Sequence, residues 1–416
     1  MKKLVVMLGM LATMGAIAQT PTGPAKGMQF EHEADWASVL AKAKKENKYI
    51  FVDAYTTWCG PCKMMASEIF PMESVGNFYN SNFINVKVQL DTTKNDNTDV
   101  VKWYADAHEI MVKYSVRVFP TYLFIAPDGK LLHRAVGASD AATFIAKGKN
   151  ALNPQTQYYS LKEKYEAGQK DPALLKALAL AAVEAYDQEH ISEYTNAYLA
   201  SQTNLLSEEN IRFMSKLTFT SKDKGFDLMM KNPAAFDAVL GKGYAKTTSR
   251  MIVMQEEVYP VIWNPEGIPA NWAELEKKLA AKYPANGKEY AAYAKVNYLM
   301  SIGNWDDFAP AITAYMRQYG TDVSPIELNN FAWAIFENCA DMNCVEQALQ
   351  WAKRAMAEKE PNYYDTYANL LYKSGKRTEA IKAQEATVAL AKSMKHANLP
   401  DFEAALTKMK AGQKTW

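Results

Sequence analysis

The sequence has 416 residues, of which 49% are hydrophobic and 22% charged, an ordinary globular composition that is long enough for two or three domains. The 47 Lys and Arg residues nearly balance the 46 Asp and Glu residues, so the formal net charge is +1. This balance excludes the strongly basic surface that nucleic-acid-binding proteins need, so no nucleic-acid partner is expected.

The first 18 residues have the composition of a signal peptide. Lys2 and Lys3 precede an apolar run, and Ala16 and Ala18 form a small-x-small cleavage site. An uncleaved membrane anchor is the alternative, but the run is shorter than the ~20 residues that span a bilayer. We therefore expect an exported, periplasmic protein in which residues 19–27 form a flexible leader.

Between residues 28 and 153 the hydrophobic pattern alternates between helix and strand, as in a mixed α/β domain. Short apolar runs predict the strands, and apolar residues at helical spacing predict the helices. Helices are predicted over 36–45, 62–70, 99–114 and from 143, and strands over 49–52, 83–90, 121–126 and 131–136.

The composition changes after Asn153, where residues rich in Ala, Leu, Tyr, Lys and Glu replace the alternating pattern. Residues 154–416 are predicted to be all α-helical, with strong helical patterns over 174–186 and 351–357. Residues 348–386 resemble the tetratricopeptide pattern of paired helices, so we expect a helical-repeat domain.

The segment Trp58-Cys59-Gly60-Pro61-Cys62 carries the chemistry of the sequence. Two thiols at this spacing, where a strand leads into a helix, form a disulfide with little backbone movement. Unpaired N–H groups at the helix N-terminus favour the thiolate of Cys59, the expected exposed nucleophile, while Cys62 is expected to be the buried resolving thiol. Half of a zinc site is the alternative. It would need a second ligand pair at the usual spacing. Neither the five scattered His residues nor Cys339 and Cys344 provide one, so no metal is predicted.

Residues 28–150 resemble the thioredoxin superfamily, whose Trp-Cys-Gly-Pro-Cys motif is matched residue for residue. Further matches to the family are Asp53, six residues before Cys59, Lys87 in a central strand, the segment 113–121 that contains Pro120, and Gly137 after the last strand. The resemblance implies an α/β thioredoxin fold, with a mixed central sheet flanked by helices, ahead of the all-α region. An insertion between Asp91 and Lys113 is expected to add a helix.

The resemblance implies catalytic roles for two charged residues besides the cysteines. Asp53 would lie buried behind the disulfide, with a raised pKa, and relay the proton that Cys62 loses before it attacks. Lys87 would neighbour Asp53 and help to set its protonation. An ordinary turn or cap residue at Asp53, and a simple strand-edge charge at Lys87, are the alternatives.

The resemblance also implies a substrate-binding surface around the cysteines. Phe119 and Pro120 would be joined by a cis bond packed against the disulfide, exposing the backbone of Phe119 to an extended substrate segment. Trp58 would shield the cysteines and belong to the docking surface together with Gly60 and Pro61. An ordinary loop proline and a core aromatic residue are the alternatives for Pro120 and Trp58.

A second pair of cysteines, Cys339 and Cys344, lies between predicted helices. Four intervening residues suit a structural disulfide that clips a loop between helices, and this is the prediction. A second redox pair and free thiols are the alternatives.

Two functions are consistent with the sequence. The first is an exported thiol–disulfide oxidoreductase similar to periplasmic disulfide reductases. It would reduce protein disulfides without a cofactor and be re-reduced by a membrane-borne electron donor. The Gly-Pro between the cysteines resembles that of reducing family members. The second is a helical-repeat adaptor or chaperone-like protein that binds a protein partner on its helical domain and uses the thioredoxin domain for redox sensing or docking.

Overall fold

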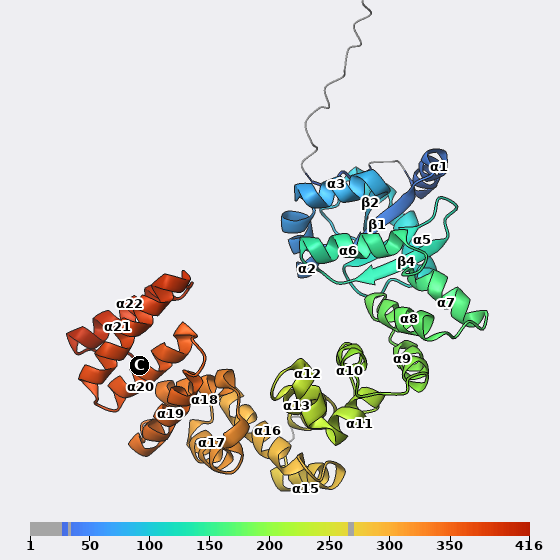
Figure 1. The fold of residues 1–416 in the computed structure, drawn as a ribbon. Coiled ribbons are helices and arrows are strands. Elements are labelled where there is room, and N and C mark those ends of the chain that lie inside the picture. The colour runs from blue at the N-terminus through green and yellow to red at the C-terminus, as the bar shows by residue number, and fades with distance from the viewer. Residues whose placement is uncertain (1–26, 32–34, 265–269) are drawn as a thin grey trace, which may run out of the picture. The chain divides into compact units, whose positions relative to one another are not determined.

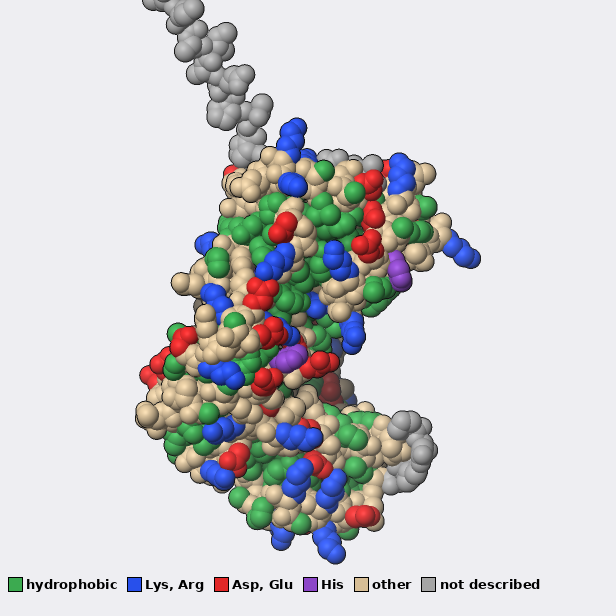
Figure 2. Space-filling view, turned by 90° about the vertical axis from the view of Figure 1, so that its right-hand side faces the viewer, with side chains coloured by type: hydrophobic (Ala, Val, Ile, Leu, Met, Phe, Trp, Pro, Cys, Tyr) green, Lys and Arg blue, Asp and Glu red, His purple; other side chains and the backbone are tan. Residues whose placement is uncertain are grey.

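The computed structural model describes residues 27–31, 35–264 and 270–416. Contacts between residues divide the chain into two compact units, residues 1–205 and 206–416. The predicted signal peptide and nearly all of the predicted leader lie outside the described residues. Among the described helices, none combines the length and the apolar character needed to cross a membrane. On the face shown in Figure 2, acidic and basic side chains are interspersed, which agrees with the balanced charge of the sequence.

The first unit is built on a four-stranded mixed sheet in the order β2-β1-β3-β4. Its strands are β1 (Tyr49–Tyr55), β2 (Phe83–Gln89), β3 (Thr121–Ile125) and β4 (Leu131–Val136). β1 pairs in parallel with β2 and antiparallel with β3, and β3 pairs antiparallel with β4. All four strands predicted from the sequence are present, and the two central ones are buried along most of their length.

Helices cover both faces of this sheet (Figure 1). Val52 and Ala54 on one face pack with buried residues of α1 (Trp36–Glu46) and α5 (Tyr104–Lys113). The opposite face carries an aromatic cluster. Its members come from the strands, α3 and α6, and they are Phe51, Tyr79, Phe83, Tyr122, Phe124 and Phe144. Side chains alternate between the faces of a strand, so neighbouring residues of β1 supply two separate cores.

Three α-helices and one π-helical turn cover the aromatic face. They are α2 (Gly60–Met64), the π-helical turn Met65–Ile69 that continues it, α3 (Glu73–Asn82) and α6 (Ala141–Leu152). The sequence did not predict α3, which contains Gly, Ser and three Asn and therefore has weak intrinsic helix propensity. Val75 and Tyr79 are fully buried, so tertiary packing stabilises this helix.

The single helix predicted over 99–114 is two helices, α4 (Thr98–Lys102) and α5. The chain turns at Trp103, whose N–H bonds to the carbonyl oxygen of Val100 and closes a tight turn. No residue of α4 is buried, so no core contact holds it in line with α5. The predicted insertion does add a helix.

Three further helices belong to the first unit, α7 (Tyr158–Glu166), α8 (Pro172–Glu184) and α9 (Ile191–Ala200). Both α7 and α8 contact β4. The fully buried His133 of β4 accepts a hydrogen bond at Nδ1 from the backbone N–H of Tyr158, at 3.1 Å. The compact unit therefore continues to residue 205, while the domain boundary expected after Asn153 stays a prediction.

The second unit is helical in every regular element that the structure describes. Its α-helices are α10 (Glu208–Ser215), α11 (Lys224–Lys231), α12 (Pro233–Leu240), α13 (Tyr244–Val253), α14 (Tyr259–Ile262), α15 (Trp272–Lys282), α16 (Gly287–Ser301), α17 (Trp305–Tyr319), α18 (Pro325–Asn338), α19 (Met342–Ala355), α20 (Pro361–Lys373), α21 (Arg377–Met394) and α22 (Leu399–Ala411). From α15 to α22 successive helices contact each other. The tetratricopeptide-like segment falls on α19 to α21, and its repeat character stays a prediction.

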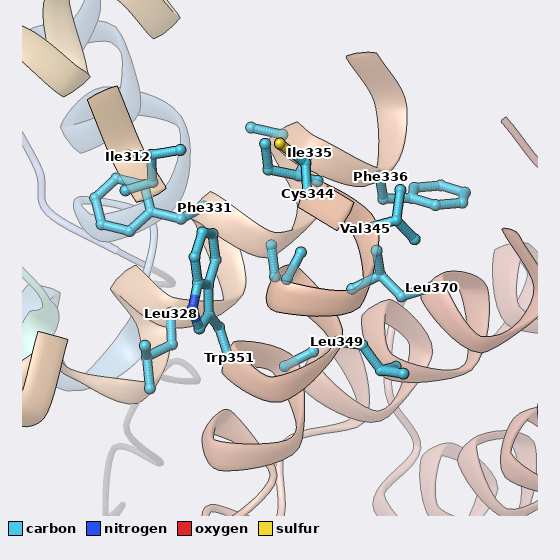
Figure 3. Close-up of a cluster of buried hydrophobic side chains, with 14 of the residues drawn as sticks. Ile312, Leu328, Phe331, Ile335, Phe336, Cys344, Val345, Leu349, Trp351 and Leu370 are labelled. Atoms are coloured by element: carbon cyan, nitrogen blue, oxygen red, sulfur yellow. The ribbon is translucent and has the colours of Figure 1, made fainter. Parts of the chain in front are cut away.

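An apolar core joins the helices of the C-terminal half of this unit (Figure 3). Phe331 and Ile335 of α18 pack with Val345 and Leu349 of α19, and Leu370 of α20 joins the same cluster. Burying side chains of this size contributes about 1.5–3 kcal/mol each, so this cluster stabilises the packing of these helices.

Candidate active site

Cys59 and Cys62 are joined by a disulfide where the segment after β1 enters α2. Cys59 is the N-cap residue of α2, and its Sγ accepts a hydrogen bond from the backbone N–H of Cys62 at 3.1 Å. Pro61 occupies the first turn, where its missing N–H leaves no helical bond unmade. Cys59 is 4% exposed and Cys62 is 6% exposed. The expected contrast between an exposed and a buried cysteine is therefore absent in the disulfide form, because one bond holds both sulfurs in the same surroundings.

The loop that carries Trp58 is fixed to the end of β2. Both the backbone N–H and the hydroxyl of Thr57 donate hydrogen bonds to the carboxylate of Asp91, the former at 2.9 Å. The N–H of Cys59 also bonds to the carbonyl oxygen of Thr56 at 3.3 Å. The indole of Trp58 stands out from this loop and is 69% exposed.

A second loop faces the same region. The Phe119–Pro120 peptide bond is cis, and Pro120 is buried. The carbonyl oxygen of Pro120 accepts a hydrogen bond from the N–H of Gly137 at 2.9 Å, and Gly137 has a φ of 85°, in the left-handed region that favours glycine. The rings of Trp58 and Phe119 meet edge to face with centroids 5.7 Å apart. The two loops therefore form one surface.

The backbone of Phe119 is free for pairing. Within the part of the chain that the structure describes, neither its N–H nor its carbonyl group makes a hydrogen bond. The neighbouring segment is held by the hydroxyl of Thr121, which donates to the carbonyl oxygen of Val118 at 2.7 Å. A fixed segment with unused backbone groups can add a strand of a bound polypeptide.

Asp53 lies in the middle of β1, paired in register with Lys87 of β2 and with Tyr122 of β3. Residues directly opposite each other point to the same face, so the three side chains share the face that α2 covers. Asp53 is 2% exposed. Burial raises the pKa of its carboxyl to about 7, although the charge of Lys87 acts in the opposite direction.

A cavity of about 270 Å³ lies beside Cys62. Its walls include Thr56, Cys62 and the side chain of Lys87, whose ammonium group also stands 4.6 Å from the centre of the Tyr55 ring. A water molecule occupies about 30 Å³ in the liquid, so this space holds several. Cys62 and Lys87 therefore line a common space, and Asp53 lies opposite Lys87 in the sheet.

Cys339 and Cys344 are free thiols in the structure, so the predicted structural disulfide is not formed. Cys339 ends α18, and Cys344 lies in the first turn of α19, inside the apolar core (Figure 3). Burial, followed by interaction with Cys339, raises the pKa of the Cys344 thiol to about 11.

Sequence reasoning missed three residues that support the site. Asp91 holds the cysteine loop, Tyr55 flanks the cavity, and Lys147 donates hydrogen bonds to the carbonyl oxygens of Val136 and Gly137, at 2.9 and 2.7 Å. Desolvation lowers the pKa of the buried Lys147 ammonium group. Tyr55 could have been found by the two-residue period from Asp53. No signal in the sequence marks a helical lysine as buried.

Comparisons with known proteins agree with this geometry. The family model described as "Thioredoxin-like domain" matches residues 36–152. A thioredoxin-like protein of Synechocystis is 33% identical over 112 residues, which are 27% of this chain and 87% of that protein. The chain belongs to the thioredoxin-like family. Its thioredoxin-like domain is followed by the helical region.

Two other relatives match the thioredoxin-like domain over part of their length. The H-type thioredoxin of Chlamydomonas reinhardtii is 46% identical over 61 residues, 15% of this chain and 51% of that protein. The thiol:disulfide interchange protein DsbD of Pseudoalteromonas atlantica is 30% identical over 120 residues, 28% of this chain and 18% of that protein. The chain thus spans about half of the first relative and less of the second. These likenesses and the Cys59–Cys62 pair support thiol–disulfide oxidoreductase chemistry in general.

Proposed function

We propose that this protein is an exported protein-disulfide reductase that works by dithiol–disulfide exchange at Cys59 and Cys62. The observation that carries the proposal is the Cys59–Cys62 disulfide at the start of α2, beside the unpaired backbone of Phe119. The first group exchanges electrons, and the second holds an extended protein segment next to it. Periplasmic location rests on the composition of residues 1–18.

The reaction begins with the reduced pair. The Cys59 thiolate attacks one sulfur of a substrate disulfide, forming a mixed disulfide and releasing the other substrate sulfur as a thiolate that takes up a proton. Cys62 then loses its proton and attacks the sulfur of Cys59. This releases the second substrate thiol and leaves Cys59 and Cys62 as a disulfide, so two electrons have passed to the substrate.

Asp53 is the acceptor for the proton of Cys62 in this scheme. With a pKa of about 7, its carboxyl is substantially ionised at neutral pH yet still basic enough to take a proton. We propose that water in the cavity that Cys62 and Lys87 both line carries the proton toward Asp53, which lies opposite Lys87 in the sheet. Lys87 acts as a positioning residue that stabilises the carboxylate form.

The proposal needs no cofactor, but it needs a source of electrons. Each turnover leaves the pair oxidised, so a reductant must restore the two thiols. For an exported protein we propose a membrane-borne donor. Protein disulfides are the proposed substrates, docked over Trp58, Gly60, Pro61, Phe119 and Pro120.

Reduction of insulin disulfides by dithiothreitol, followed by turbidity, tests the chemistry. The full chain is expected to accelerate the reaction, and Cys59→Ser to abolish the acceleration because the attacking sulfur is gone. Cys339→Ser is the matched control and should retain full activity. Activity that survives in Cys59→Ser would refute catalysis by this pair.

The adaptor function remains a second candidate because the helical unit contains a large groove of its own, lined by both polar and apolar residues. Under that function the second unit would bind its partner equally well whether Cys59 and Cys62 are oxidised, reduced or replaced by serine. Under the reductase function, activity on protein disulfides depends on the pair and not on the second unit.

A further inference from the structure

The second unit contains a groove of about 1240 Å³ formed by alternate helices of its C-terminal half. α18, α20 and α22 supply most of its wall, and α20 contacts both of the others (Figure 1). Sites for small molecules are typically about 300–1,000 Å³. The size of the groove therefore favours a larger ligand.

Each of these helices gives one face to the groove. The contributing residues recur every three or four positions, and they are Ile326, Asn329, Asn330, Trp333, Ala334, Glu337 and Asn338 on α18, Asn362, Tyr363, Asp365, Thr366 and Asn369 on α20, and Asp401, Phe402, Ala404, Ala405 and Lys408 on α22. Such spacing defines a continuous stripe along a helix. The stripes on α18 and α20 are mostly polar and that on α22 is mostly apolar, whereas other faces of α18 and α20 pack into the apolar core.

The groove carries an excess of negative charge. Glu337 and Asp401 are exposed, and no ion-pair partner for either occurs in the described part of the chain. Glu360 differs, since it pairs with His396 at 3.2 Å. Lys408 is the one lysine among the lining residues. Two carboxylates are therefore available to a cationic ligand.

The asparagines of the groove use part of their hydrogen-bonding capacity within the protein. The side-chain amides of Asn338 and Asn369 donate to the carbonyl oxygens of Ala334 and Asp365, at 3.1 and 3.0 Å. Asn329 Oδ1 has no hydrogen-bond partner among the described residues, but this atom is buried. Asn330, Asn338 and Asn398 are exposed and add amide groups to the surface of the groove.

Apolar contacts are also available at one end of the groove. Trp333 is half-buried and packs on Phe336 with ring centroids 4.9 Å apart, and Trp305 packs edge to face on Phe308. Ile326 is 58% exposed. Indole faces bind the ammonium or guanidinium groups of Lys and Arg as well as apolar side chains.

We infer that the groove of α18, α20 and α22 binds an extended polypeptide segment that carries Lys or Arg side chains. The segment supplies positive charge to Glu337 and Asp401, and its apolar side chains pack on Ile326 and on the exposed parts of Trp305 and Trp333. A simple polyamine would satisfy the carboxylates but has no side chains that could cover this apolar surface. This inference does not depend on the redox chemistry of Cys59 and Cys62.

Fluorescence anisotropy with the full chain tests the inference. The probes are two labelled, cysteine-free peptides of about 12 residues, roughly 40 Å long when extended, in which Ala and Tyr alternate with Lys in one and with Glu in the other. We expect binding of the Lys peptide, weakening with added salt, and no binding of the Glu peptide. Because neither probe contains a disulfide, failure here and failure of the reductase proposal are separate results.

The variant Glu337→Gln/Asp401→Asn is expected to weaken binding of the Lys peptide at least about 5-fold, since each exposed charge pair contributes up to roughly 1 kcal/mol. Glu379→Gln, an exposed carboxylate on α21 outside the groove, should leave affinity unchanged. Circular dichroism would verify that all variants are folded. Equal affinity for both peptides, equal loss in the control, or spermidine binding as tight as that of the Lys peptide would overturn the inference.

Discussion

Asp53 is the residue whose surroundings most affect its chemistry. It lies between Lys87 and Tyr122 in the sheet, away from solvent, and burial holds its pKa near 7. The same burial destabilises the folded state when the carboxyl is ionised. A single side chain thus links the proposed proton transfer to the stability of the domain.

The first prediction concerns the rate of exchange. Asp53→Asn removes the proton acceptor for Cys62, so the second step should slow by at least about 10-fold at pH 7, toward the lower end of general-base effects. In the native protein the rate should rise as pH passes through about 7, because the carboxylate form grows. Stopped-flow measurement of Trp58 fluorescence checks both. An unchanged pH profile in the variant would remove Asp53 from the mechanism.

The second prediction concerns stability. Between pH 4 and pH 7 the folded protein keeps a proton on Asp53 that the unfolded chain releases, so the stability contributed by the protonated form is lost as pH rises. Asp53→Asn abolishes this loss and should stabilise the domain at pH 8 by about 2–4 kcal/mol. Urea unfolding at pH 8 and pH 4 measures the difference, which should shrink at pH 4. Equal stabilisation at both values would contradict the assignment.

At the scale of elements, the most informative contact is that of α7 and α8 with β4. Glu184 of α8 accepts a hydrogen bond from Asn150 of α6 at 3.0 Å and lies 3.8 Å from Nε2 of the buried His133. Burial raises the pKa of Glu184, but the interactions with His133 and Asn150 are larger together and lower it. The carboxylate therefore attaches α8 to the sheet.

Glu184→Ala is expected to destabilise the first unit by about 1–3 kcal/mol, because it removes the acceptor of the Asn150 amide and the carboxylate beside the buried His133. Glu163→Ala is the control. Its ion pair with Lys130 joins α7 to the same edge of the sheet, but both side chains are at least half exposed, so a loss below about 1 kcal/mol is expected. Thermal unfolding of the full chain measures both. A larger loss in the control would show that the attachment does not depend on Glu184.

At the scale of the whole molecule, contacts between residues divide the chain into two compact units, residues 1–205 and 206–416, while the domain boundary after residue 153 stays a prediction. A fragment of residues 20–205 keeps α7 and α8 on β4, whereas a fragment of residues 20–153 exposes the edge that contains His133. The longer fragment should retain the insulin-reducing activity of the full chain. The shorter one should unfold at least about 5 °C lower. Equal melting temperatures would place the boundary at 153.

The sequence predicted the fold class and all four strands because local hydrophobic patterns encode them. It also singled out Cys59 and Cys62, since their spacing and the Pro between them are local properties. It did not reveal α3, because the burial of Val75 and Tyr79 that stabilises this helix depends on distant parts of the chain. It did not reveal the break at Trp103 either, because the absence of any buried residue in α4 also depends on what packs around it.

The sequence by itself determined the redox motif, the α/β domain and the helical character of residues 154–416, since each follows from the spacing and the hydrophobic pattern of residues close together in the chain. Only the tertiary structure decided that Asp91 holds the cysteine loop, that Lys147 and His133 are buried, that Cys339 and Cys344 are thiols, and that stripes of three helices line one groove. These features arise where segments far apart in sequence meet, and the resulting desolvation and hydrogen bonding have no local signature.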